Sequence, residues 1–258
     1  MITTIFTSFC VIIFSYLIGS LNFSILISKF FFKKEIRNLG SKNAGATNML
    51  RIFGKKFAIL TFLGDFFKGS FCVVLVNVLF KFKPEFLKLS LITFEDYFMN
   101  FKIEFQMLAM LGVVLGHIFP IFFNFKGGKG VSTTAGALLF IDFKIFIMVI
   151  AFFAFILIIS KIVSLSSILT AIFYAAFSAI YWFIKFELIN FDFSIISFQI
   201  WFLITIKSTF LSFIIIAKHK ENIKRLIKKT EPKIGRRKKL NENKILCAWR
   251  WKFWNSSC

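Results

Sequence analysis

The sequence predicts an all-α protein that crosses a membrane several times. Hydrophobic residues make up 58% of the 258-residue chain, and its mean hydropathy of +0.79 is far above that of a soluble domain. Apolar stretches recur at lengths that can span about 30 Å of hydrocarbon. The first of them, residues 2–28, carries no charge, so we expect a retained membrane span rather than a cleaved signal peptide.

Six apolar stretches follow one another along the chain. They cover residues 2–28, 57–80, 105–125, 131–160, 162–184 and 193–217. The fourth stretch is 30 residues long, and its only charged residues are Asp142 and Lys144. We therefore predict that the chain turns near 141–144 and that this stretch makes two passes.

The charges of the connecting segments decide between six crossings and seven. Residues 29–56 carry eight Lys or Arg against one Glu, whereas residues 81–104 carry four Lys against three Glu and one Asp. The positive-inside rule places the first connector in the cytoplasm and the second outside. Residues 218–239 carry eleven Lys or Arg and must lie on the same side as 29–56. This requires seven transmembrane helices, with the N-terminus outside and the C-terminus in the cytoplasm.

The helix that starts at Val131 must be short or broken. Only about 11 residues precede the predicted turn, which corresponds to roughly 16 Å of helix, too little to cross a bilayer alone. Broken helices in membrane proteins place backbone polar groups against a polar cavity or buried protein. The segment "FKGGKG", residues 125–130, which leads into this helix, is therefore a candidate site.

Four polar segments fall on the cytoplasmic side of this topology. They are "GSKNAGATNMLR" (40–51), "FKGGKG" (125–130), "SKIVSLSS" (160–167) and "KHKENIKRLIKKTEP" (218–232). Any one of them alone fits a solvated basic loop. In the first two, glycines let backbone N–H groups approach an oxyanion, and basic side chains lie beside them. Together they predict a cationic groove for two phosphate groups next to lipid.

Charged residues inside the predicted spans have two readings. Asp65 and Lys68 are three residues apart in the second span, where ionisable side chains are costly. They either have a function or neutralise each other. His117 follows Gly112 and Gly116, a spacing that also fits a histidine packed beside a close helix contact.

Several classes of chemistry lack their sequence signatures. The chain contains no HEXXH, GXSXG or Walker A motif and no carboxylate cluster, and its cysteines show no zinc or disulfide spacing. We therefore expect no metal and no cofactor. The net charge of +21 is concentrated in a few connectors, which indicates membrane orientation rather than nucleic-acid binding.

Three segments resemble, in order and spacing, the motifs of the bacterial integral-membrane acyl-phosphate:glycerol-3-phosphate acyltransferases. They are "GSKNAGATNMLR", "GHIFPIFFNFKGGKG" and "HKENIKRLIKKTEPKIG", and the resemblance covers about residues 2–235. It implies transfer of a fatty acyl group from acyl phosphate to the 1-hydroxyl of glycerol 3-phosphate, giving lysophosphatidic acid and phosphate. It also implies a multi-pass protein of the bacterial inner membrane, among membrane lipids, with the site facing the cytoplasm. We expect a monomer.

The resemblance implies a role for each motif residue. The catalytic residues would be Ser41, Arg51, Lys129, His219 and Asn222. Glycerol 3-phosphate would be bound by Ser41, Arg51, Lys126 or Lys129, Ser164 and Asn222, and acyl phosphate by Asn43, Gly45, Thr47, Asn48, Gly127, Gly128 and His117. His219 or His117 could accept the hydroxyl proton, but we favour a phosphate oxygen of the substrate, with the histidines positioning groups.

The chain departs from the family pattern at two glycines. Lys42 and Lys229 stand where the family usually has glycine, so the loop at Lys42 puts a side chain where φ is expected to be positive. Lys229 is expected to affect only a helix C-cap.

We assign residues 1–240 to the membrane domain and 241–258 to a disordered tail. A channel or transporter for phosphorylated solutes is the alternative function, although the two halves show no inverted repeat.

Overall fold

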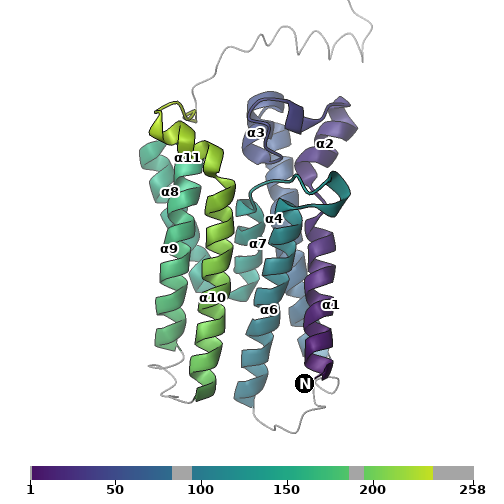
Figure 1. Cartoon of the computed structure of the whole chain (residues 1–258), viewed down its shortest axis with the longest axis vertical. Helices are drawn as coiled ribbons and strands as arrows, with labels where there is room; N and C mark the ends of the chain where they lie inside the picture. The colour runs from purple at the N-terminus through teal and green to yellow at the C-terminus, as the bar shows by residue number, and fades with distance from the viewer. Residues whose placement is uncertain (1, 83–94, 186–194, 235–258) are drawn as a thin grey trace, which may run out of the picture.

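The computed structural model of the protein describes residues 2–82, 95–185 and 195–234, and every regular element in these ranges is a helix (Figure 1). The long helices are α1 (Ile2–Gly19), α4 (Lys55–Phe82), α6 (Glu95–Ile118), α8 (Phe143–Ser160), α9 (Val163–Phe183) and α10 (Ile195–Lys218). The shorter ones are α2 (Phe23–Phe32), α3 (Ala46–Phe53), α7 (Val131–Ile141) and α11 (Lys220–Ile227), together with the single 3-10 turns η1 (Ile36–Asn38) and η2 (Ile121–Phe123). The predicted tail, 241–258, lies outside the described residues.

The predicted set of spans is confirmed. In the described part of the chain, six segments are long and apolar enough to cross a membrane, and the apolar α7 has 11 residues. The predicted turn is also present, because α7 ends at Ile141 and α8 begins at Phe143. Asp142 lies between them with extended backbone and caps α8, its Oδ1 accepting the Lys144 N–H at 2.9 Å.

Close helix contacts fix the arrangement of the bundle. Helix α1 packs against α6, α4 packs against the short α7, and α9 packs against both α8 and α10. Figure 1 shows these helices running side by side along the bundle. A Cβ at Gly116 would lie 2.1 Å from the Tyr16 carbonyl oxygen, and one at Gly112 would lie 2.6 Å from that of Ile12. Of the two readings of the glycine spacing beside His117, the close helix contact is therefore present, with α1 as the partner.

The first span contains a break that the sequence did not predict. Helix α1 ends at Gly19 and α2 begins at Phe23, with Asn22 capping α2 by accepting the Ile25 N–H at 3.2 Å. The Lys68 ammonium donates to the carbonyls of Gly19 and Leu21 at 2.9 and 2.7 Å. A buried break survives in a membrane only when its free backbone groups find such partners.

Lys68 therefore does more than neutralise Asp65. Its ammonium lies 3.0 Å from the Asp65 carboxylate and 2.9 Å from His117 Nδ1, and all three side chains are buried. The network joins α4 and α6 to the break in the first span. We expected His117 to contact acyl phosphate, and in the structure its ring is buried in this network with Asp65 and Lys68.

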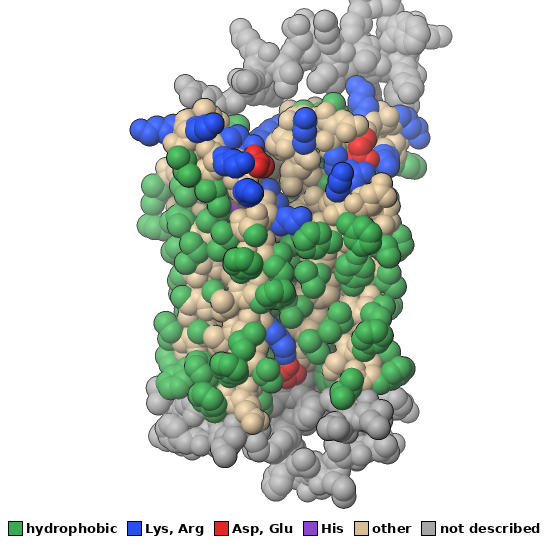
Figure 2. Space-filling model, in the orientation of Figure 1, with side chains coloured by type: hydrophobic (Ala, Val, Ile, Leu, Met, Phe, Trp, Pro, Cys, Tyr) green, Lys and Arg blue, Asp and Glu red, His purple; other side chains and the backbone are tan. Residues whose placement is uncertain are grey.

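Basic side chains gather at one end of the bundle. Figure 2 shows hydrophobic side chains over the flanks and most of the visible Lys and Arg side chains at the end that carries α2, α3 and α11. The start of α1 lies at the opposite end (Figure 1). The two ends of the described chain are thus on opposite sides, as an odd number of crossings requires. Which side faces the cytoplasm stays a prediction from the charge pattern.

Candidate active site

Asn48 organises the loop that carries Ser41. The buried Asn48 Nδ2 lies 3.0 Å from the carbonyl oxygens of Leu39 and Asn43 and 3.3 Å from that of Ile36, while Oδ1 accepts the Ser41 N–H at 2.9 Å. Both ends of its amide are therefore used by backbone. We expected Asn48 to contact acyl phosphate, and the structure instead shows it shaping the loop around Ser41.

The same loop contains the predicted positive φ angles. Gly40 has a φ of 56°, and a Cβ there would lie 2.4 Å from Asn48 Oδ1, so the tight turn requires glycine. Lys42 has a φ of 60°, which confirms the left-handed geometry expected at this family glycine. A non-glycine residue in this conformation costs about 1–2 kcal/mol.

The glycine-rich loop is bonded to the end of α6. The Gly127 N–H donates to the Ile118 carbonyl at 3.2 Å, and the Gly128 N–H donates to the His117 carbonyl at 3.1 Å. A Cβ at Gly128 would lie 2.1 Å from His117 Nε2. This corrects the expectation that these two N–H groups face a phosphate. The absence of side chains at Gly127 and Gly128 instead allows the loop to pack closely on α6. This packing helps to fix the backbone position of Lys129, the next residue.

Four of the predicted residues for glycerol 3-phosphate meet around one carboxylate, Glu231. It accepts hydrogen bonds from Ser164 Oγ at 2.9 Å and Asn222 Nδ2 at 2.7 Å. The Lys129 ammonium donates to Asn222 Oδ1, and Arg51 Nη2 lies 3.8 Å from Glu231 Oε1. These side chains come from α3, the loop before α7, α9 and α11. The structure thus brings these residues together in one cluster, which we name the Glu231 cluster: Arg51, Lys129, Ser164, Asn222, Arg225 and Glu231.

Glu231 itself was missed as the centre of the cluster. Arg225 Nε also donates to its Oε2 at 2.6 Å, and the Glu231 side chain is 3% exposed. The available signal was a single acid, within "TEP", that directly follows a strongly basic helix. That signal also fits an ordinary solvated charge, so only the fold distinguishes the two.

The end of α11 turns Glu231 back toward the cluster. Lys229 has a φ of 54° and donates its N–H to the Leu226 carbonyl, while the Thr230 N–H donates to the Arg225 carbonyl at 2.8 Å. This pair of bonds is a Schellman C-cap, which confirms the expected effect of Lys229 on a helix end. The Ile234 N–H then donates to the carbonyl of Lys161, which lies between α8 and α9, at 2.7 Å. This bond attaches the segment after α11 to the connection between those two helices.

The electrostatics of the cluster favour a divalent anion. Burial raises the pKa of Glu231, but hydrogen bonds from Arg225, Asn222 and Ser164 outweigh it and hold the pKa below its usual value. Burial lowers the pKa of Lys129 to about 8; Glu231 opposes this shift and Arg225 and Arg51 add to it. With Lys129 charged, three cations face one carboxylate, and the net charge of +2 matches a phosphate dianion.

His219 lies next to the cluster as a neutral imidazole. Its Nδ1 lies 2.7 Å from the Ile215 carbonyl oxygen, which can only accept, so Nδ1 carries the proton and Nε2 is a free acceptor. Burial, with the positive charge of Lys129 adding to it, lowers the pKa of His219 to about 4. At neutral pH the ring can therefore accept a hydrogen bond from a substrate hydroxyl.

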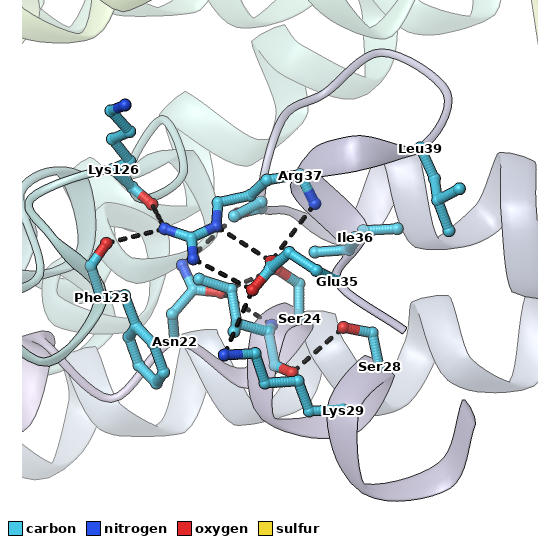
Figure 3. Close-up of polar contacts among 12 residues, drawn as sticks. Asn22, Ser24, Ser28, Lys29, Glu35, Ile36, Arg37, Leu39, Phe123 and Lys126 are labelled. Atoms are coloured by element: carbon cyan, nitrogen blue, oxygen red, sulfur yellow. Dashed lines mark hydrogen bonds and ion pairs between the residues drawn. The ribbon is translucent and has the colours of Figure 1, made fainter. Parts of the chain in front are cut away.

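The remaining predicted residues lie outside the Glu231 cluster. Three of them, Ser41, Asn43 and Gly45, are half-buried on the loop before α3. Thr47 is half-buried in the first turn of α3. Thr47 also lines a groove of about 240 Å³ between α3 and α4, with Ala58 and Phe62 among its other walls. The carbonyl of Lys126 accepts from Arg37, and its side chain points away from that network (Figure 3). Of the two lysines, the structure thus brings Lys129 into the cluster.

The fold and site together define an integral-membrane protein with a polar, net cationic site at one end of a helix bundle. Among the described residues, no group of three His, Cys, Asp or Glu side chains could hold a metal ion. Residues 9–229 match the family model described as glycerol-3-phosphate acyltransferase, and the chain belongs to this family.

Individual relatives and solved structures agree with this assignment. The glycerol-3-phosphate acyltransferase of Mycoplasmopsis synoviae is 40% identical over 85% of this chain and 91% of its own. That of Bacillus subtilis is 36% identical over 86% of this chain and 95% of its own. The crystal structure of PlsY, an integral membrane glycerol 3-phosphate acyltransferase, in its glycerol 3-phosphate form matches with a TM-score of 0.66 and 29% identity, over 89% of this chain and 96% of that one. A lysophosphatidic acid form of PlsY matches with a TM-score of 0.63.

Proposed function

We propose that the protein transfers a fatty acyl group from acyl phosphate to the sn-1 hydroxyl of glycerol 3-phosphate. The products are 1-acyl-glycerol 3-phosphate and inorganic phosphate, in the synthesis of phospholipids. The observation that carries this proposal is the Glu231 cluster, whose net charge of +2 and converging donors suit the phosphate of glycerol 3-phosphate. The solved relatives add support, because their forms are those of glycerol 3-phosphate and lysophosphatidic acid.

In this proposal Arg51 and Lys129 bind the phosphate of glycerol 3-phosphate. The Arg51 guanidinium lies 3.8 Å from Glu231, which leaves its fork available for bidentate contact with phosphate oxygens. Asn222 and Ser164 keep Lys129 and Glu231 in place through their side-chain bonds. Ser41 contacts the glycerol backbone from the loop that Asn48 holds.

The donor occupies the lipid-facing side of the same end. Asn43, Gly45 and Thr47 contact the acyl phosphate from the start of α3. The glycerol hydroxyl oxygen attacks the acyl carbonyl carbon, the carbon–oxygen bond to phosphate breaks, and phosphate leaves. Before the attack, the hydroxyl donates a hydrogen bond to His219 Nε2, which orients it. As the new carbon–oxygen bond forms, the same proton passes to an oxygen of the departing phosphate.

An acyl phosphate requires little further activation from the protein. It is already a mixed anhydride, so alignment of the two substrates and fixed positive groups near the developing charge supply most of the catalysis. The site then needs neither a strong base nor a metal. The basic end of the bundle faces the cytoplasm of a bacterial cell, and the protein acts as a monomer in the inner membrane.

A donor assay tests this proposal. Purified protein in a lipidic medium receives labelled glycerol 3-phosphate and, in separate reactions, palmitoyl phosphate, palmitoyl-CoA or palmitoyl carrier protein. We expect product only from palmitoyl phosphate and its loss in Ser41→Ala. Ser167→Ala is the control. Ser167 lies near the start of α9, and among the described residues its hydroxyl bonds only to the Val163 carbonyl of its own helix. Product from another donor, or none from any donor with folded protein, contradicts the proposal.

A further inference from the structure

Arg37 joins two segments that are far apart in the sequence. It lies in η1, next to the loop that carries Ser41, and its Nη1 donates to the carbonyls of Phe123 and Lys126 at 2.7 and 3.0 Å. Figure 3 shows the guanidinium between these two carbonyls and the carboxylate of Glu35. One side chain thus spans the gap between the 36–48 loop and the glycine-rich loop.

The guanidinium is held in one orientation. Nε and Nη2 donate to the two oxygens of Glu35 at 2.9 and 3.0 Å, a bidentate pair, and the Lys29 ammonium lies 3.3 Å from the same carboxylate. The Glu35 carboxylate thereby stays ionised, because the hydrogen bonds from Arg37 and Lys29 outweigh its burial and lower its pKa. A lysine could not provide this geometry, since its single ammonium cannot pair with the carboxylate and reach both carbonyls in one plane.

The turn that Arg37 contacts contains two residues in a conformation that side chains disfavour. Asn124 and Phe125 have φ angles of 55° and 56°, two successive left-handed residues without a glycine. The bonds from Arg37 fall on Phe123 and Lys126, the residues on either side of this pair. Gly127, Gly128 and Lys129 follow directly. This turn, together with the bonds from Gly127 and Gly128 to the end of α6, therefore sets the position of the Lys129 backbone.

We call the contacts of Arg37 with Glu35, Phe123 and Lys126 the Arg37 clamp. On its other side lies the loop of Ser41. Asn48 bonds to the carbonyls of Ile36 and Leu39, which flank Arg37, and to the Ser41 N–H. The η1 turn and Ser41 therefore belong to one hydrogen-bonded unit. We propose that Arg37, oriented by Glu35, is a positioning residue that fixes the Ser41 loop and the Lys129 loop relative to each other.

The kinetic consequence rests on the proposed function. Lys129 keeps its bond to Asn222 without Arg37, so glycerol 3-phosphate still binds, but the acceptor and the Ser41 side of the site lose their alignment. A displacement of about 1 Å can lower a rate by about 100-fold. We therefore expect Arg37→Ala to lower kcat by about 10- to 100-fold and to change the KM for glycerol 3-phosphate by less than about threefold.

Two readouts separate positioning from a loss of folding. Millimolar guanidinium should restore part of kcat to Arg37→Ala, because the ion can occupy the vacated site between Glu35 and the two carbonyls, and should do nothing for Arg37→Lys. Lys34→Ala is the matched control: it removes an exposed positive charge from the same connector and should keep wild-type kinetics. A kcat of wild-type size in Arg37→Ala, or a loss that guanidinium does not restore, overturns the inference.

An activity-independent measurement tests the clamp itself. Spin labels are placed at the exposed positions Asn38→Cys and Phe122→Cys in a chain whose four cysteines are replaced by serine. We expect a narrow distance distribution by double electron–electron resonance, which broadens in Arg37→Ala and not in Lys34→Ala. A distribution that stays narrow in Arg37→Ala overturns the clamp. If the parent protein forms no acylated product, the proposed function fails, while the label distances still decide the clamp.

Discussion

The Lys129 ammonium donates to the side-chain carbonyl of Asn222, 93 residues further along the chain. The same amide also links Lys129 to Glu231, because Asn222 Nδ2 donates to the Glu231 carboxylate at 2.7 Å. A loop between two spans and a helix beyond the last span therefore share one polar site. The predictions below follow from this linkage and from the backbone around it.

The first prediction concerns the pH dependence of glycerol 3-phosphate binding. The pKa of Lys129 is lowered to about 8, so its ammonium is present below that pH and is lost as the pH rises through it. We expect kcat/KM for glycerol 3-phosphate to fall above about pH 8, since this ratio reports the free enzyme. In Lys129→Arg the charge persists, and the fall should move to higher pH. A wild-type profile that is flat to about pH 9.5 would contradict the assignment.

A second prediction concerns Glu231. Glu231→Gln removes the charge that Arg225 and Arg51 face, and it changes the net charge of the cluster from +2 to +3. We expect the melting temperature to fall, because hydrogen bonds to a charged acceptor contribute about 1.5–3 kcal/mol each. We also expect kcat/KM to fall at least about 10-fold. Steady-state kinetics and thermal unfolding of the purified protein measure both.

Glu221→Gln provides the matched control for this experiment. Glu221 lies on α11, before Glu231 in the chain. Its side chain is 69% exposed and, within the described part of the chain, pairs only with the exposed Lys224. Such surface pairs contribute little. If the two variants behave alike, Glu231 does not organise the cluster.

The third prediction concerns the two lysines at family glycine positions. Lys42 and Lys229 have φ angles of 60° and 54°, a conformation that costs a non-glycine residue about 1–2 kcal/mol. Glycine avoids this steric cost, but part of the gain is lost because glycine gives up more backbone entropy on folding. Lys42→Gly and Lys229→Gly should each raise the unfolding free energy by about 0.5–1 kcal/mol with activity retained. Lys228→Gly, at a φ of −77°, should lower it. Thermal unfolding that ranks Lys228→Gly above Lys229→Gly would contradict this account.

Much of the fold was predictable because charge is rare in the apolar stretches. Asp142 and Lys144 stand out within 30 apolar residues, and they mark the turn between α7 and α8. The break after Gly19 has no such mark. Its residues are Ser20, Leu21 and Asn22, which are uncharged, and the Lys68 that satisfies it is 47 residues beyond Leu21. Long-range partners of this kind are set by packing and not by local sequence.

The candidate site was predictable in its members but not in all their roles. Glycines and lysines in "FKGGKG" indicate that backbone comes close to another group, but not which group. In the structure that group is the end of α6 for Gly127 and Gly128, and only Lys129 reaches the cluster. Glu231 shows the opposite case, since a lone acid among lysines reads as a solvated charge until the Schellman turn places it inside.

The last prediction concerns the buried network at the break in the first span. Lys68→Met leaves the carbonyls of Gly19 and Leu21 without their donor and Asp65 without its cation. Removing one partner of a buried ion pair costs about 3–5 kcal/mol, so we expect a large fall in melting temperature and in the yield of folded protein. Adding Asp65→Asn should recover part of the loss, because it removes the uncompensated charge but not the unpaired carbonyls. Lys56→Met, an exposed lysine on the same helix, should be neutral. If Lys68→Met melts with Lys56→Met, the break is held by packing alone.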